Sequence, residues 1–323
     1  MKIRDSIKFE IARFTRSYPT LLSELREQFY FGSREILLEY MNLDRQTLLL
    51  ADIQHGFPRM VRAKHSLLGR GRIPDLVWTD YQNLKNKKGK FEANLKRQVP
   101  IGSSWLYMRK IKNLTLTENL EKDSQTKGTL MVVPHSDNFQ NLSIDEGFED
   151  YLDLNRVDGV LLFNEDFLNP MIRSVAKNRN IEIECAGLPR TYQPQAYLTR
   201  AGGRESFLFE TYKIFKKYRN LISPNFSTAL IYGANAGLNV GILNTWTPKY
   251  LCSSATTRSG ISENRSSQFL GEVFPFSLNL IHDSENLSDW AKITLGFDYM
   301  KSPEELHQII PYIEKVLPDF ILQ

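Results

Sequence analysis

The sequence has few cysteines and no long apolar run. Among its 323 residues only Cys185 and Cys252 carry a thiol. Two thiols cannot build a disulfide framework or a four-thiolate zinc site, and this usage fits a reducing cytoplasm. No stretch approaches the ~18–20 consecutive apolar residues of a membrane span, and charges interrupt the N-terminal segment where a signal peptide needs a continuous apolar core. The sequence therefore predicts a soluble cytoplasmic protein.

Several signatures of well-known enzyme classes are also missing. The segment Gly102-Ser103-Ser104-Trp105 is not the G-x-S-x-G elbow of an α/β-hydrolase. Residues 69–73 (GRGRI) lack the third glycine of a dinucleotide fingerprint, and no G-x-x-x-x-G-K-[ST] phosphate loop occurs anywhere. No histidine stands in metal-ligand spacing with either cysteine, so we expect neither a metal nor a bound cofactor.

What is present is a globular composition with an uneven charge. Apolar residues make up 41% of the chain and charged residues 24%, which excludes wholesale disorder. Residues 1–122 carry 23 Lys or Arg against 13 Asp or Glu, whereas residues 123–323 carry 18 against 24. A basic half and an acidic half indicate two modules with different partners. We therefore predict two domains, 1–122 and 123–323, joined by a polar linker at 118–127.

The densest basic stretch lies at residues 85–97, with six Lys or Arg and a single Glu. It is either a solvated face or a surface for an anionic partner. Because each basic residue near anionic lipid contributes roughly 1 kcal/mol, six of them would hold the protein at the inner face of a membrane. No nucleic-acid motif accompanies the stretch, so nucleic acid is not expected as a partner.

Short apolar runs that alternate with helical patterns fill most of the chain. Such runs are typical of buried parallel strands joined by helical crossovers, which predicts an α/β fold. The predicted strands are 47–53, 76–79, 99–101, 129–133, 157–163, 181–185, 220–223 and 240–243. The predicted helices include 148–154, 170–178, 206–219, one from Ser227 to about Gly237, and a closing helix at 302–322 that Pro311 breaks or kinks.

Each predicted strand ends in small or polar residues. In open α/β sheets ligands bind at the carboxyl ends of the strands. The strongest candidate is the segment 223–237 (SPNFSTALIYGANAG), in which Ser227 and Thr228 precede an apolar helix. Serine and threonine there cap the helix, and the free N–H groups of its first turn can hold an anion. The alternative is an ordinary helix cap.

Other strand ends carry groups suited to phosphate or sugar. His135 and Ser136 directly follow the strand 129–133, and Glu165 follows the next strand. The histidine can donate to a phosphate, and the carboxylate can bind ribose hydroxyls or cap the following helix. In the basic half, His55 between Gln54 and Gly56 ends the first strand, where it can act as a general base on an acceptor hydroxyl. An ordinary turn histidine is the alternative reading.

These ordered motifs resemble the two-domain GT-B glycosyltransferases of bacterial capsule and lipopolysaccharide synthesis and, more distantly, the CDP-glycerol-type teichoic acid transferases. The likeness rests on the Q-H-G at 54–56, the P-H-S at 134–136, the A-G at 186–187 and the S-x-N-x-S-T at 223–228. It implies two Rossmann-like domains facing across a cleft, with the nucleotide-sugar donor held by the second. It also implies a metal-independent transfer to a glycan or lipid-linked acceptor, with the nucleotide (CMP, CDP or UDP) left open.

The same resemblance implies roles for individual residues. His55 would be the catalytic group, and Gln54, Gly56 and Ser103 would lie on the acceptor side. The donor would contact eight residues: His135, Ser136, Glu165, Gly187, Ser223, Asn225, Ser227 and Thr228. Two alternatives remain: a non-catalytic scaffold of the same fold in a polysaccharide-assembly complex, and a nucleotide-sugar epimerase.

Overall fold

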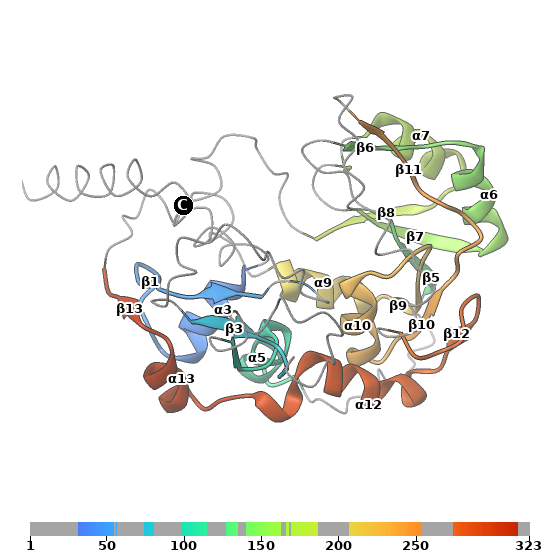
Figure 1. Cartoon of the computed structure of the whole chain (residues 1–323). Helices are drawn as coiled ribbons and strands as arrows, with labels where there is room; N and C mark the ends of the chain where they lie inside the picture. Colours follow the sequence, from blue (N-terminus) through green and yellow to red (C-terminus); the bar gives the residue numbers. More distant parts are fainter. Residues whose placement is uncertain are drawn as a thin grey trace, which may run out of the picture. The chain divides into compact units, whose positions relative to one another are not determined.

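A computed structural model describes residues 32–54, 56, 74–80, 98–114, 127–134, 140–162, 166–167, 169–186, 207–252 and 274–315. This part of the chain is mixed α/β, which confirms the predicted fold class (Figure 1). It forms two compact units. Unit 1 holds the described residues up to Tyr107 and from Gly296 onward, and unit 2 holds those from Met108 to Leu295. The predicted boundary between residues 122 and 123 lies outside the described residues.

The core of unit 2 is a six-stranded sheet whose first five strands in sequence run parallel to their neighbours. A short sixth strand, β12, pairs antiparallel with the edge strand β10. The strands are β5 (Lys127–Val132), β7 (Val157–Leu162), β8 (Glu182–Cys185), β9 (Tyr218–Ser223), β10 (Asn239–Ile242) and β12 (Ile281–His282). Beside this sheet, β6 (Gln140–Ser143) and β11 (Lys249–Cys252) form an antiparallel pair.

The spatial order of the sheet is β12-β10-β9-β5-β7-β8. Numbered along the chain, the five parallel strands therefore lie in the order 3-2-1-4-5, which is the order of the first five strands of the doubly wound sheet 3-2-1-4-5-6. The order reverses between β5 and β9, because the chain first builds outward from β5 to β8 and then returns to the other side of β5. This point is the topological switch of unit 2.

Five helices of unit 2 cover both faces of the sheet. Ile222 of β9 belongs to a core with Phe148 and Ile172. The preceding residue, Leu221, points to the opposite face of the sheet and packs against Gly233. Figure 1 accordingly has α6 and α7 (green) on one side of the sheet and α9, α10 and α12 on the other. The helices are α6 (Glu146–Leu154), α7 (Pro170–Asn178), α9 (Phe207–Phe215), α10 (Thr228–Asn235) and α12 (Ser284–Leu295).

The starts of the unit 2 helices follow local capping rules. Asp145 caps α6 by accepting from the Phe148 N–H, and Asn169 caps α7 by accepting from the Met171 N–H at 3.0 Å. Pro170 occupies the first turn of α7, where its missing N–H costs nothing. These caps explain why the helix 170–178 was predictable from the sequence, and why α6 begins two residues before the predicted 148–154.

Unit 1 contains a second, smaller parallel sheet. Its strands β2 (Asp52–Ile53), β3 (Asp75–Val77) and β4 (Gln98–Pro100) lie in sequence order. A separate antiparallel pair joins β1 (Leu48–Leu49) to β13 (Tyr312–Ile313) near the end of the chain. The remaining elements are α3 (Ser33–Tyr40), the 3-10 helix η5 (Phe297–Tyr299), α13 (Pro303–Ile309) and α5 (Ser104–Ile111), which begins in unit 1 and ends in unit 2.

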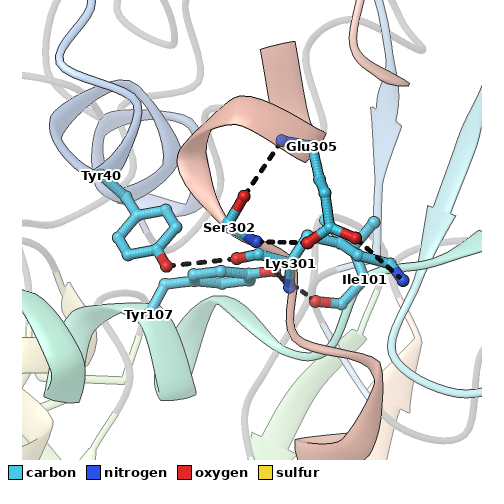
Figure 2. A network of polar contacts seen from close by, with 6 residues as sticks. All are labelled: Tyr40, Ile101, Tyr107, Lys301, Ser302 and Glu305. Atoms are coloured by element: carbon cyan, nitrogen blue, oxygen red, sulfur yellow. Dashed lines mark hydrogen bonds and ion pairs between the residues drawn. The ribbon is translucent and has the colours of Figure 1, made fainter. Parts of the chain in front are cut away.

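The buried Tyr107 and the half-buried Tyr40 bind the C-terminal segment within unit 1 (Figure 2). The Tyr107 hydroxyl donates to the Ile101 carbonyl at 2.5 Å and accepts from the Lys301 N–H at 2.9 Å. Tyr40 donates to the Lys301 carbonyl at 3.1 Å, so both backbone groups of Lys301 are bound. Ser302 then starts α13 through a reciprocal capping box with Glu305. Burial raises the pKa of the Tyr107 hydroxyl, which keeps this bond donor protonated.

Three sequence predictions of secondary structure were wrong in detail. The helix predicted over 206–219 ends at Phe215, because Tyr218 and Arg219 begin β9, where Tyr218 pairs with Lys127 of β5. The closing helix ends at Ile309, which confirms the predicted break at Pro311, but Tyr312–Ile313 then forms a strand, and residues 316–322 lie outside the described residues. The strand predicted over 47–53 is divided into β1 and β2, which belong to different sheets.

Candidate functional site

The site begins at the switch point of unit 2, where β5 and β9 end side by side. Their register pairs Met131 with Ile222, so the turns that leave both strands start at the same level. After β5 the backbone continues through Val133, whose N–H donates to the Leu161 carbonyl of β7 at 3.1 Å. After β9 it passes through Pro224 and Asn225 to the start of α10. Ligands of open α/β sheets bind at this position.

The first turn of α10 begins at this edge of the sheet, and two of its N–H groups already donate to Ser227: that of Ala229 to the hydroxyl and that of Leu230, at 3.0 Å, to the carbonyl. Ser227 has extended backbone angles and its Oγ accepts from the Ala229 N–H at 3.3 Å, as in an ordinary cap. The first turn contains no Asp or Glu, unlike the first turns of α6 and α13. Since no carboxylate of its own offsets the positive end of the helix dipole, the turn favours an external anion. Thr228, the first helical residue, is half-buried beside Ser227.

Ser223 is the last residue of β9 and begins the connection that leads to α10. Its side chain is 1% exposed and its hydroxyl donates to the Val132 carbonyl of β5 at 3.4 Å. Ser223 therefore links the two strands that flank the switch point. Asn225, two residues on, is half-buried and makes no side-chain hydrogen bond within the described part of the chain. The structure thus brings four of the predicted donor residues together on one turn: Ser223, Asn225, Ser227 and Thr228.

The opposite end of α10 is held by Arg109, a residue that the sequence analysis did not single out. Its side chain is 1% exposed, and its guanidinium donates to the backbone carbonyl of Asn235 and, at 3.0 Å, to the Asn235 Oδ1. A cation at a helix C-terminus is favourable because it meets the negative end of the dipole. The sequence feature that could have identified Arg109 as a buried residue is its position directly after the apolar run Trp105–Met108 of α5.

The described acceptor-side residues of unit 1, Gln54 and Ser103, use their side chains for hydrogen bonds within the protein. The Gln54 Oε1 accepts from the Trp78 N–H at 2.9 Å, and its Nε2 donates to the Gly56 carbonyl at 2.8 Å. Ser103 is fully buried and its Oγ accepts from the Trp105 N–H at 3.1 Å, at the start of α5. Their acceptor-side role stays a prediction. His55, which lies between Gln54 and Gly56, is outside the described residues, as are four donor residues: His135, Ser136, Glu165 and Gly187.

A second polar cluster lies at the amino end of the unit 2 sheet and is closed by protein partners. The Tyr218 hydroxyl donates to Glu184 at 3.2 Å, and Lys217 contacts both Glu184 carboxylate oxygens at 2.9 Å. Tyr218 reaches Glu184 across Gly159, where a Cβ would overlap its hydroxyl. Burial, followed by the Glu184 charge, raises the pKa of Tyr218. These groups satisfy one another, so this cluster supports the sheet rather than a ligand.

Two broader searches of the described residues gave no further site. No group of three or more His, Cys, Asp or Glu side chains in this part of the chain is placed to hold a metal ion. None of the described helices has both the length and the apolarity that a membrane span requires.

Comparison with known proteins adds no relative to this picture. No protein-family model, curated protein or solved structure matches the chain.

Proposed function

We propose that this chain is a glycosyltransferase that moves a sugar from a nucleotide-activated donor to a glycan or lipid-linked acceptor. The observation that carries the proposal is the doubly wound strand order of unit 2, with Ser223, Asn225 and the cap of α10 at its switch point. Nucleotides bind at such points, with their phosphates at a helix N-terminus. Transfer from a nucleotide-sugar requires stabilisation of a departing phosphate, and helix N–H groups supply it without a metal.

The roles follow from the chemistry of each group. The N–H groups of the first turn of α10 bind the donor phosphate, and Ser227 fixes their direction by capping the helix. Asn225 offers an amide to the same ligand. His135 and Ser136, predicted after β5, would approach from the neighbouring strand. His55 would remove the proton from the acceptor hydroxyl, and a GT-B arrangement of two Rossmann-like domains would bring it to the donor.

The proposal is tested with Ser227→Asp. Aspartate caps a helix about as well as serine, so the helix is retained while a carboxylate is placed where the phosphate binds. We expect wild-type protein to be stabilised by one of CMP, CDP, UDP or GDP; at ~100 times the Kd a ligand contributes ~2.7 kcal/mol, a shift of a few degrees in Tm. The variant should keep its own Tm and lose this shift.

Ser302→Asp is the matched control, because Ser302 caps α13 in unit 1 in the same way. It should bind nucleotide as the wild type does. If no nucleotide shifts the Tm of the wild type, the glycosyltransferase proposal fails. If a nucleotide binds but no nucleotide-sugar is turned over, as measured by release of the free nucleotide, the chain is a binding or scaffold protein instead.

A further inference from the structure

Two aromatic rings on α9 are each flanked by two cations, one from residues 109–112 at the end of α5 and one from residues 213–216 at the end of α9. The Phe209 ring has Lys112 at 5.5 Å and Lys213 at 4.5 Å from its centre. The Tyr212 ring has Arg109 at 5.6 Å and Lys216 at 5.8 Å. The members of each set are three residues apart in the sequence: Arg109 and Lys112, Phe209 and Tyr212, and Lys213 and Lys216. Residues at this spacing lie on the same face of a helix, so each ring lies between one cation of each segment. We call this set of six residues the lysine ladder.

The outer part of the lysine ladder is exposed and strongly basic. Lys112 and Lys216 are exposed, and the Lys213 side chain is 46% exposed and forms an ion pair with Glu210 at 2.9 Å. Residues 109–113 and 207–219 together contain seven Lys or Arg and one acidic residue, Glu210. On the other face of the sheet, α6 contains four acidic residues and no basic one. The basic residues near α9 and the acidic residues of α6 therefore lie on opposite faces of the sheet.

We propose that the lysine ladder is a docking surface for an anionic lipid membrane. The attraction is a match of charge, since each Lys close to an anionic lipid surface adds to binding. The half-buried Phe209 ring lies beneath the ammonium groups of Lys112 and Lys213 and holds these charges at the surface. The surface is separate from the switch point, so the inference does not depend on the proposed glycosyl transfer.

Two features favour a lipid surface over a soluble anionic ligand. The ladder's single arginine is buried and bound to Asn235, so the exposed cations are lysines, which act as hydrated point charges without the planar fork that recognises single phosphates. In addition, cations lie over both rings, which removes these rings as stacking platforms for a base or a sugar. What remains is a diffuse basic surface, which suits a plane of anionic headgroups.

The test is co-sedimentation of the full chain with vesicles of phosphatidylcholine, alone or mixed with phosphatidylglycerol. We expect binding only to the anionic vesicles, and release as salt rises from ~0.1 M to ~1 M, where the screening length falls from ~10 to ~3 Å. The double variant K112E/K216E reverses two exposed charges. It should lower the partition coefficient at least about 30-fold, the loss expected when two lysines stop contributing.

The variant K177E/K292E makes the same change in net charge on α7 and α12 and should bind as the wild type does. The milder K112Q/K216Q, with intermediate loss, guards against a folding defect in the reversal variant, and thermal unfolding checks all of them. The proposal is overturned if anionic vesicles do not bind, or if both reversal variants bind equally. Retention on a soluble polyanion without vesicle binding overturns it too, and assigns the ladder to another class of partner.

Discussion

The carboxyl edges of the two parallel sheets differ in how they use their polar residues. In unit 1, Gln54 ties the end of β2 to the backbone of Trp78 beyond β3, and Ser103 caps α5. In unit 2, the edge opens into the turn 223–228, where the Asn225 side chain makes no hydrogen bond within the described residues. A polar residue after a strand therefore indicates a ligand only where the fold has not already used its hydrogen bonds.

Glycine packing explains why the edge in unit 1 is closed. Gly102 and Gly296 both have positive φ, at 79° and 73°, and the Gly102 N–H donates to the Trp78 carbonyl at 3.1 Å. A Cβ on Gly296 would overlap that same carbonyl. The C-terminal segment therefore passes directly across the ends of β3 and β4, and only residues without a side chain allow this approach.

Of the substitutions considered, Gly296→Ala should lower the free energy of unfolding most, because it disrupts the contact that covers the carboxyl edge of the unit 1 sheet. An alanine in the left-handed backbone conformation costs about 1–2 kcal/mol of stability, and its Cβ must also displace the Trp78 carbonyl. We expect a loss of more than ~3 kcal/mol in the free energy of unfolding, measured by urea denaturation. Gly102→Ala is the matched comparison: its Cβ would lie 2.9 Å from the Gly296 carbonyl, which is a smaller overlap. It should therefore cost more than the about 1–2 kcal/mol of the left-handed backbone alone but less than Gly296→Ala. Equal losses would contradict the steric explanation.

Gln54→Met tests whether the polar groups of unit 1 serve the fold. Methionine nearly preserves the volume but removes the acceptor for the Trp78 N–H and the donor for the Gly56 carbonyl. Leaving a buried N–H without a partner costs about 1–3 kcal/mol, and we expect a loss of this size in urea denaturation. In unit 2, Asn225→Ala should change the stability by no more than ~0.5 kcal/mol. A comparable loss for both would remove the difference between the two edges.

The sequence predicted the larger sheet better than the smaller one. Strands β5, β7, β9 and β10 each contain a short apolar segment, and the caps at Asn169 and Ser227 mark helix starts, so local rules located these elements. By contrast, β1 and β13 have two residues each, too few for any periodicity. The contact between Gly102 and Gly296 joins distant parts of the chain and has no local signature.

The helix predicted over 206–219 shows how pairing overrides pattern. Phe215 and Tyr218 continue the helical spacing of α9, but Tyr218 instead pairs with Lys127 in β5 and sends its hydroxyl to Glu184. The candidate site was predictable to a similar extent. The turn 223–228 follows from local motifs, whereas the burial of Arg109 against Asn235 depends on the packing of α5 against α10.

Ser223→Ala should have the smallest effect on the free energy of unfolding. It tests whether the buried hydroxyl at the carboxyl edge of unit 2 serves the fold or a ligand. The Ser223 hydroxyl is buried but its bond to the Val132 carbonyl is long, at 3.4 Å, so we expect a loss below ~1 kcal/mol in the free energy of unfolding. Because the proton of this hydroxyl is engaged with β5, its loss should lower the affinity for nucleotide by less than about tenfold, as measured by titration calorimetry. A loss of stability near that of Gln54→Met would mean that Ser223 closes the edge of unit 2 as Gln54 closes that of unit 1. Complete loss of nucleotide binding by a stable variant would instead mean that the hydroxyl turns from Val132 to the ligand, and the carboxyl edge of unit 2 would then be a site that rearranges on binding.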